Sequence, residues 1–213
     1  MPKIAPVDAD HVVLVHGLWL NALAMKPLAA RLNNCGFKVT RYGYHSVRRG
    51  LRENVDRLAA WCEQVGTPLH LVGHSLGGLL IMTLLHHHPR IPVRRVALLG
   101  SPYASSAAAQ GLSHSATGRG LLGLTIQDWL RQPRPPIPAG VEAGIIAGDL
   151  SIGLGRLFVR LPKPNDGVVV VDETRVPQAA ASIVLHTSHS GMLLSPKVAH
   201  AVCSFLKNGR FGA

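Results

Sequence analysis

The segment PLHLVGHSLGGLLIMTLLHHHP, residues 68–89, carries the residues whose types and spacing most directly suggest chemistry. Ser75 lies between Gly73 and Gly77, where a strand-like apolar run gives way to a helix-like one. A strained strand-to-helix turn exposes the hydroxyl of such a serine, and flanking glycines let the strand and the helix approach each other closely. The pattern therefore predicts a nucleophile. A glycine-rich helix start alone would explain the glycines but not the serine.

A serine nucleophile needs a base, an acid that orients the base, and donors for the negative oxygen that forms during the reaction. We expect the backbone amide of Leu76, directly after the serine, to supply one donor. The loop HGLW, residues 16–19, follows the first apolar strand, and we expect the amide of Leu18 to supply the other. The glycine of this loop would let the backbone approach a substrate closely.

Four segments in chain order carry a resemblance to a known family, and they are VLVHGLW, LVGHSLGG, PNDGVVVVDET and HTSHSGML. Together they resemble the α/β-hydrolase fold, especially its small bacterial esterases and lipases, over essentially the whole chain. The resemblance implies the chain order nucleophile, acid, histidine. Only ten residues precede the first strand, so we expect a minimal, mostly parallel sheet of about six strands, with helices on both faces and no large cap domain.

The expected base is His189, which lies in the loop between the last predicted strand and the closing helix. A loop position lets the imidazole reach over the sheet edge toward Ser75. His186 falls within the predicted last strand, and His200 within the helix. His74 precedes the serine directly, and its side chain is expected to point away from the site.

Four carboxylates compete for the role of the acid. Asp166, in PNDGVV, corresponds by resemblance to the acid-bearing loop of the family and is the first choice. Because Asn-Asp-Gly is also a plain turn signal, the alternatives stay open. Asp149 ends the strand-like run GIIAGD, and Asp172 and Glu173 follow soon after the first choice.

Strand-like and helix-like segments alternate along the chain, which predicts a parallel sheet with right-handed crossovers. Several strands are continuous runs of Val, Leu and Ile, as expected where helices cover both faces of a sheet. The expected strands are residues 11–17, 37–44, 69–75, 93–101, 144–149 and 182–188, and the expected helices between them are residues 21–36, 50–66 and 76–89.

Residues 102–141 depart from this alternation, since they are rich first in Gly, Ser and Ala and then in Pro. A crossover to the next parallel strand requires a helix, which we expect around residues 126–131, with the remainder forming a short flap or lid. Residues 150–166 allow no structural prediction. With no internal repeat or domain boundary visible, residues 1–213 are expected to form a single domain.

The composition, with 47% hydrophobic and 15% charged residues, predicts a compact core. No apolar stretch reaches the roughly 18 residues that span a membrane, and the start of the chain lacks the pattern of a signal peptide. A cytoplasmic protein is therefore expected. Cys35, Cys62 and Cys203 lie far apart and are odd in number, so we expect buried thiols in a reducing compartment.

The formal net charge of +11 is the one unusual global property. Basic residues form small groups, without a zinc-finger spacing or an RNA-binding signature, so nucleic acid is not an expected partner. Weak association with anionic surfaces stays open. The histidines at 86–88 precede Pro89 and are expected to end a helix, not to bind a metal.

Together these features predict a serine hydrolase that cleaves carboxylic esters through an acyl-enzyme, with a histidine base, a carboxylate that holds it, and no metal or organic cofactor. The apolar segment GLLGLT, together with Trp19 near the oxyanion turn, favours small-molecule or lipid-like acyl esters. Thioester hydrolysis, amide hydrolysis and acyl transfer would use the same residues. The alternative from another class is a non-catalytic protein of this fold that binds an anionic partner.

Overall fold

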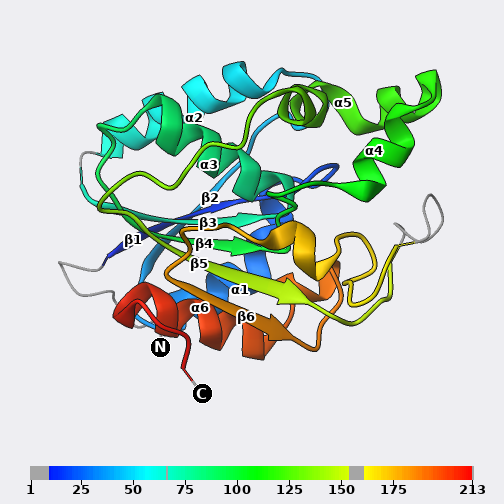
Figure 1. The fold of residues 1–213 in the computed structure, drawn as a ribbon. Coiled ribbons are helices and arrows are strands. Elements are labelled where there is room, and N and C mark those ends of the chain that lie inside the picture. The colour runs from blue at the N-terminus through cyan, green and yellow to red at the C-terminus, as the bar shows by residue number, and fades with distance from the viewer. Residues whose placement is uncertain (1–9, 66, 154–160, 213) are drawn as a thin grey trace.

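The computed structural model describes residues 10–65, 67–153 and 161–212. Its centre is a sheet of six strands, all paired in parallel, in the order β2-β1-β3-β4-β5-β6 (Figure 1). The strands are β1 (His11–Val15), β2 (Lys38–Tyr42), β3 (Leu69–His74), β4 (Val93–Leu99), β5 (Glu142–Gly148) and β6 (Ala181–Leu185). The predicted sheet is confirmed, and each strand ends slightly earlier than expected because the chain turns there into the loops that form the site.

Helices cover both faces of the sheet, as the alternation predicted (Figure 1). One face carries α2 (Leu51–Val65) and α3 (Leu76–His87), and the other carries α1 (Lys26–Asn34) and α6 (Pro196–Asn208). Among the described residues, the connections include the short 3-10 helices η1 (Ala22–Met25), η3 (Val171–Thr174) and η4 (Ser190–Leu193). Among the helices of the described residues, none is both long and apolar enough to cross a membrane.

Strand β1 shows why the central strands are apolar without alternation. Val13 and Val15 pack with side chains of α2 and α3, whereas Val12 and Leu14 pack on the other face with side chains of α1 and α6. All four are fully buried. Because burying one such side chain stabilises a fold by roughly 1.5–3 kcal/mol, two covered faces favour an apolar residue at every position of the strand.

Residues 102–141 contain two helices, α4 (Ala107–Ser113) and α5 (Ala116–Arg131), where the sequence predicted one around 126–131. The Gly, Ser and Ala content indicated a loop, but two of the serines are N-caps. The Ser106 hydroxyl accepts the Ala109 amide, and the Ser115 hydroxyl accepts the Gly118 amide. Side chains that cap helix starts in this way compensate for a weak helix-forming composition.

Helix α5 is kinked at Gly123, where φ is 70° and ψ is 176°. Beyond the kink, the Thr125 hydroxyl donates to the carbonyl of Arg49 at 2.7 Å. The carboxylate of Asp128 accepts the amide of Leu51, at the start of α2, at 2.9 Å. The second half of α5 is therefore fixed to the start of α2, and the first half extends with α4 beyond it (Figure 1).

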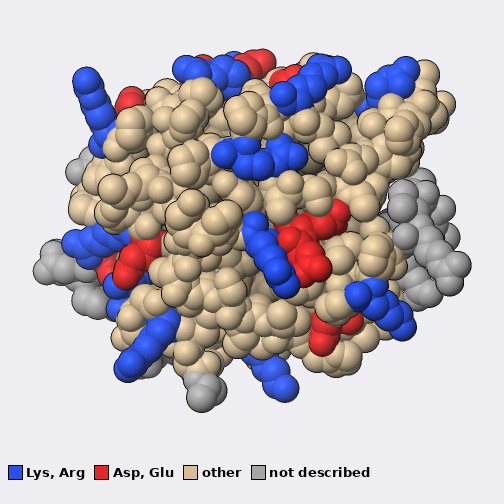
Figure 2. Space-filling model, viewed as in Figure 1, with Lys and Arg blue, Asp and Glu red and all other residues tan. Residues whose placement is uncertain are grey.

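Charged side chains are scattered over the surface that Figure 2 shows, with basic residues more frequent than acidic ones. Both arginines of α2 lie beside carboxylates one turn away, Arg52 with Asp56 at 2.9 Å and Arg57 with Glu53 at 3.2 Å. Exposed pairs of this kind stabilise a protein by less than about 1 kcal/mol. The positive charge is therefore distributed, as the small basic groups in the sequence indicated.

A disulfide joins Cys35, at the end of α1, to Cys203 in α6. The expectation of three free thiols is wrong for these two residues. Their separation of 168 residues concealed the pairing, because only the packing of α1 beside α6 on one face of the sheet brings their Cα atoms to 6.4 Å. Cys62 is free and buried, as expected, and burial raises the pKa of its thiol to about 12.

We expect the substitution Cys35→Ala to lower the free energy of unfolding by about 2–5 kcal/mol, because the disulfide restricts the unfolded chain over a long loop. Urea denaturation without reductant measures the change. Reductant should lower the stability of the wild type toward that of the variant and leave the variant unchanged. If the free energy of unfolding of the wild type does not change although its disulfide has been completely reduced, the expectation is wrong.

Candidate active site

Ser75 occupies the turn between β3 and α3 in a backbone conformation that is rare for a residue with a side chain, with φ at 52° and ψ at −122°. Helix α3 begins so close to β1 and β3 that the residues on either side of Ser75, Gly73 and Gly77, must lack a Cβ. A Cβ on Gly73 would overlap the backbone of Gly78, and a Cβ on Gly77 would overlap the carbonyl of Val15. The glycines therefore permit the crowding, and the crowding holds the serine in its strained turn.

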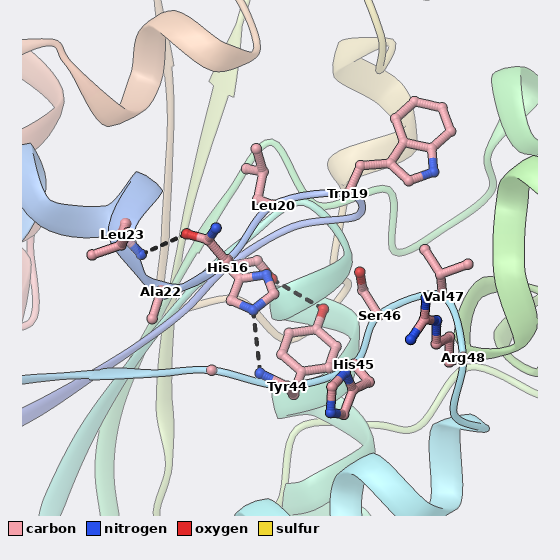
Figure 3. Close-up of a pocket in the computed structure, with 12 residues that line it drawn as sticks. His16, Trp19, Leu20, Ala22, Leu23, Tyr44, His45, Ser46, Val47 and Arg48 are labelled. Carbon is pink, nitrogen blue, oxygen red and sulfur yellow. Dashed lines mark hydrogen bonds between the residues drawn. The ribbon is translucent and has the colours of Figure 1, made fainter.

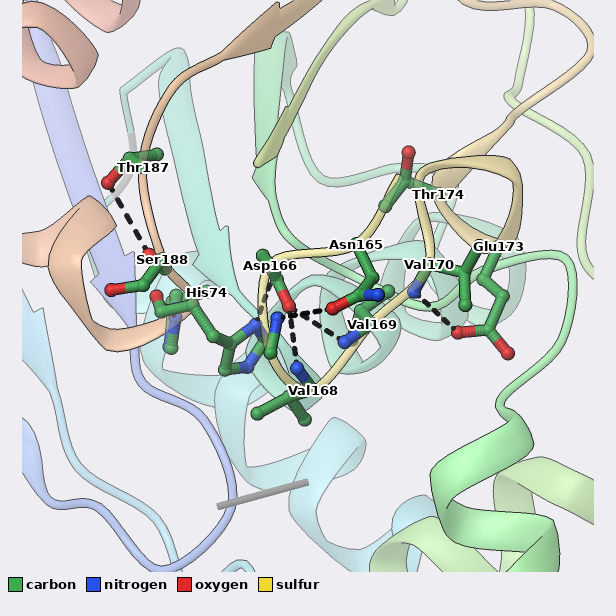
Figure 4. Close-up of polar contacts among 12 residues, drawn as sticks. His74, Asn165, Asp166, Val168, Val169, Val170, Glu173, Thr174, Thr187 and Ser188 are labelled. Carbon is green, nitrogen blue, oxygen red and sulfur yellow. Dashed lines mark hydrogen bonds and ion pairs between the residues drawn. The ribbon is translucent and has the colours of Figure 1, made fainter. Parts of the chain in front are cut away.

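Asp166 and His189 lie against each other, although 23 residues separate them in the chain. The His189 Nδ1 is 2.7 Å from the Asp166 Oδ2. The other carboxylate oxygen accepts the amides of Val168 and Val169, at 2.9 and 2.7 Å, and Figure 4 shows these two residues beside Asp166. The carboxylate is 1% exposed. A carboxylate that accepts a hydrogen bond from Nδ1 keeps the ring proton on that nitrogen. Nε2 is then free to accept a proton from another group.

Two of the three alternative acids lie on the surface and pair elsewhere. Asp149 is 2.8 Å from the Nδ1 of His186, whose side chain is 76% exposed. Asp172 forms an exposed ion pair with Arg175 at 2.8 Å. His186 lies just beyond β6, not within it as predicted, and His200 lies within α6, as predicted.

The third alternative, Glu173, is buried and helps to position α4. Its carboxylate accepts the amide of Ala107, at the start of that helix, and the amide of Val170 at 2.9 Å (Figure 4). Desolvation raises the pKa of this carboxyl group. The N-terminus of a helix attracts negative charge, so the Glu173 carboxylate is favourably placed at the start of α4. Because the same carboxylate accepts the Val170 amide, it joins α4 to the loop that carries Asp166. Of the four candidates, the structure brings Asp166 to His189.

The two amides expected to bind an oxyanion lie at the predicted places. Leu76 is the first residue of α3, so its N–H has no acceptor within the helix. Leu18 follows β1 in the turn after the strand. Within the described part of the chain, neither amide donates to a backbone carbonyl.

His16 and Tyr44 hold the turn that contains Leu18 (Figure 3). The His16 Nδ1 lies 2.9 Å from the carbonyl of Gly17, its Nε2 accepts the Tyr44 amide at 3.3 Å, and the two rings stack at 4.4 Å. The Tyr44 hydroxyl donates to the His16 carbonyl at 3.0 Å. Desolvation lowers the pKa of His16, which keeps its ring in the neutral form that can both donate and accept.

Ser75, His189, Leu18 and Leu76 line one cavity of about 270 Å³. Apolar side chains from α4, α5 and the loops around Asp166 form most of its wall, and they are Ala108, Ala109, Leu112, Leu122, Ile126, Ile152, Val168 and Val169. The Ser75 hydroxyl makes no hydrogen bond among the described residues. Such bonds are often long in enzymes without substrate and tighten when substrate binds.

The predicted apolar wall GLLGLT contributes to this cavity through Leu122. Its neighbours Leu121 and Leu124 are 42% and 50% exposed instead. Trp19, which the sequence placed near the site, lines the cavity as expected, and its Nε1 donates to the carbonyl of Leu121 at 2.8 Å. Sequence reasoning gave no sign of this bond between the oxyanion turn and α5.

The sequence suggested that the side chain of His74 points away from the site, and this prediction is wrong. Its Nε2–H donates to the carbonyl of His189 at 3.0 Å, and the two rings lie 4.7 Å apart. Desolvation, and next the nearby charge of His189, lowers the pKa of His74 to about 3. The ring is therefore neutral and supports the loop that carries His189. A separation of 115 residues concealed this contact.

The model of the alpha/beta hydrolase family matches residues 12–205 of the chain, from β1 to α6. The chain belongs to this family. The fold class and the family resemblance inferred from the sequence are therefore confirmed. The match includes the positions of Ser75, Asp166 and His189.

Solved structures share the hydrolase fold at low sequence identity. The Bacillus licheniformis lipase BlEst2 in its mature form is 21% identical, with a TM-score of 0.74 over 98% of this chain and 95% of the other. The propeptide form of BlEst2 gives a TM-score of 0.77 at 21% identity and 99% coverage, and this chain spans 52% of its length. The pyrethroid hydrolase PytH is 15% identical, with a TM-score of 0.69 over 94% and 98% of the two chains. Comparison with curated proteins found no match.

The free energy of unfolding is expected to decrease as the pH is lowered below about 6.5. The reason is that the pKa of His74 is about 3 in the folded protein, whereas in the unfolded chain it has the usual value of 6.5. The unfolded chain then binds a proton that the folded protein excludes. The cost rises by up to about 1.4 kcal/mol per pH unit until the folded pKa is reached. Urea denaturation between roughly pH 7 and 4.5 measures this slope.

The variant His74→Gln keeps an N–H donor but has no group that titrates in this range, so its slope should be shallower by about one proton. The buried ring of His16, whose pKa is also lowered, maintains part of the slope in both proteins. Equal slopes for the wild type and the variant would show that His74 does not titrate as the structure indicates.

Proposed function

We propose that the protein is a serine hydrolase that cleaves carboxylic esters through an acyl-enzyme, with Ser75 as nucleophile, His189 as base and Asp166 as acid. The observation that carries the proposal is the buried Asp166–His189 bond at 2.7 Å, since His189 lines the same cavity as the strained Ser75. Membership of the alpha/beta hydrolase family supports it. The similar folds of a lipase and a pyrethroid hydrolase agree with it.

In the first half of the reaction, His189 Nε2 takes the hydroxyl proton as Ser75 Oγ bonds to the ester carbonyl carbon. The carbonyl oxygen becomes negative, and the amides of Leu18 and Leu76 stabilise it. Asp166 stabilises the imidazolium. The bond to the alcohol oxygen then breaks, and the imidazolium gives its proton to the departing alcohol, leaving the acyl group on the serine.

In the second half, His189 takes a proton from a water molecule, whose oxygen attacks the acyl carbon. The same two amides stabilise the second negative oxygen, and the imidazolium returns its proton to Ser75 as the acid leaves. No step uses a metal or an organic cofactor. One oxyanion donor contributes roughly 100-fold to 1,000-fold to the rate in enzymes of this kind.

The substrate we propose is a small-molecule or lipid-like acyl ester, because apolar side chains dominate the wall of the 270 Å³ cavity. Thioesters and acyl transfer would use the same groups. Cytoplasmic localisation stays a prediction from the sequence, and the disulfide between Cys35 and Cys203 weighs against it, since such bonds persist mainly in oxidising compartments.

A fluorophosphonate probe should label the wild type and not Ser75→Ala, because the probe reacts with an activated serine hydroxyl. The same two proteins should be tested on p-nitrophenyl esters of increasing acyl length. We expect hydrolysis by the wild type to decline for long chains that exceed the cavity, and the variant to lose at least about 1,000-fold in kcat. A wild type that neither labels nor hydrolyses any ester of the series contradicts the proposal and favours the non-catalytic alternative.

The variants Asp166→Asn and Asp149→Asn form a matched pair, because each removes one carboxylate charge beside a histidine. We expect Asp166→Asn to lower kcat by about 10,000-fold, since the histidine would lose its tautomer and the stabilisation of its charge. Asp149→Asn should stay within about twofold of the wild type, because its partner is on the surface. A reversed order of the two effects would assign the acid to Asp149.

A further inference from the structure

A second cavity, of about 530 Å³, lies beside the proposed active site at the carboxyl ends of β1 and β2 (Figure 3). Trp19 and Leu20 line both cavities, so the two meet at the oxyanion turn. The second cavity does not contain Ser75 or His189 in its wall. It is therefore a space next to the reacting groups that the proposed reaction does not yet use.

Ser46 presents an unused hydroxyl to this cavity. The residue is only 5% exposed, but its hydroxyl is not among the fully buried atoms without a partner, and no hydrogen bond of the described residues involves it. In Figure 3 the hydroxyl points toward the loop that carries Trp19 and Leu20. Because the residue lines the cavity and its hydroxyl is not engaged by another described residue, it can donate a hydrogen bond to a ligand there.

Arg48 gives the cavity a positive charge that no carboxylate of the described residues neutralises. The next arginine, Arg49, lies 3.0 Å from Glu53, and Arg52 lies 2.9 Å from Asp56. Arg48 forms no ion pair within the described part of the chain, and neither Asp nor Glu is among the residues that line the cavity. Its guanidinium can donate two parallel hydrogen bonds to a carboxylate or a phosphate.

We propose that this cavity binds a carboxylate or phosphate group carried by the alcohol part of the ester, with Arg48 and Ser46 as donors. The inference rests on the proposed function. With the carbonyl carbon at Ser75, the acyl chain would fill the apolar 270 Å³ cavity and the alcohol would extend past Trp19. The second cavity opens to solvent beside the exposed side chains of Arg48 and His45, which suits the product that leaves first.

The test compares four esters that share a butyryl group and differ in their alcohol. p-Nitrophenyl butyrate reports the basal activity, butyrylglycerol is the neutral reference, and butyryl esters of glycerate and of glycerol 3-phosphate carry the two anionic groups. We expect at least one anionic ester to exceed butyrylglycerol in kcat/KM by roughly 10-fold, the effect of one charge-assisted hydrogen bond. The two anionic esters distinguish a carboxylate site from a phosphate site.

The variants Arg48→Ala and Arg52→Ala form the matched control, since each removes one positive charge from the same surface and only Arg48 lines the cavity. Arg48→Ala should abolish the preference for the anionic ester, Ser46→Ala should reduce it by a few fold, and both should keep the basal activity. Arg52→Ala should leave the preference unchanged. Competition with p-nitrophenyl butyrate by glycerol 3-phosphate provides a second measurement of the same site.

The outcomes separate this inference from the function on which it rests. If p-nitrophenyl butyrate is hydrolysed but no anionic ester is preferred, the inference is wrong and the hydrolase remains. If Arg52→Ala lowers the preference as much as Arg48→Ala, the general positive field selects the anion and the local site is refuted. If no ester is hydrolysed by the wild type, the proposed function itself fails.

Discussion

The site depends on the close approach of the first turn of α3 to β1 and β3. Without side chains at Gly73 and Gly77, the helix starts directly above the strand ends. The crowding places Ser75 at positive φ and leaves the amide of Leu76 without an acceptor. One steric constraint thus provides both an exposed hydroxyl and a donor beside it, and the loops from β1, β5 and β6 complete the arrangement around them.

The electrostatics around His189 follow from burial. A carboxylate at 1% exposure is tolerated because three donors, one imidazole and two amides, meet its oxygens. His74, on the other side of the loop, is held neutral by its own burial and adds a hydrogen bond without adding charge. Asp166 thereby holds the ring of His189, and His74 holds its backbone carbonyl.

Much of this arrangement could be predicted from the sequence, because local patterns encode it. Apolar strands, glycines around the serine and the chain order of Asp166 and His189 indicated the sheet, the elbow and the triad candidates. The contacts that were missed join distant segments. Neither the disulfide, nor the bond of His74 to the His189 loop, leaves a local pattern, because tertiary packing alone brings those residues together. The serine N-caps of α4 and α5 were visible in principle, but the composition around them resembled a loop.

The disulfide between Cys35 and Cys203 closes a covalent ring that contains the serine, the aspartate and the histidine of the site. A single cleavage of the backbone anywhere inside that ring leaves two fragments that stay linked. The segment with β1 and the oxyanion turn is continuous with Cys35 and stays attached as well. A single nick inside the ring therefore cannot separate the molecule into two parts, and a protease must cut twice within the ring to release any of the residues between the two cysteines.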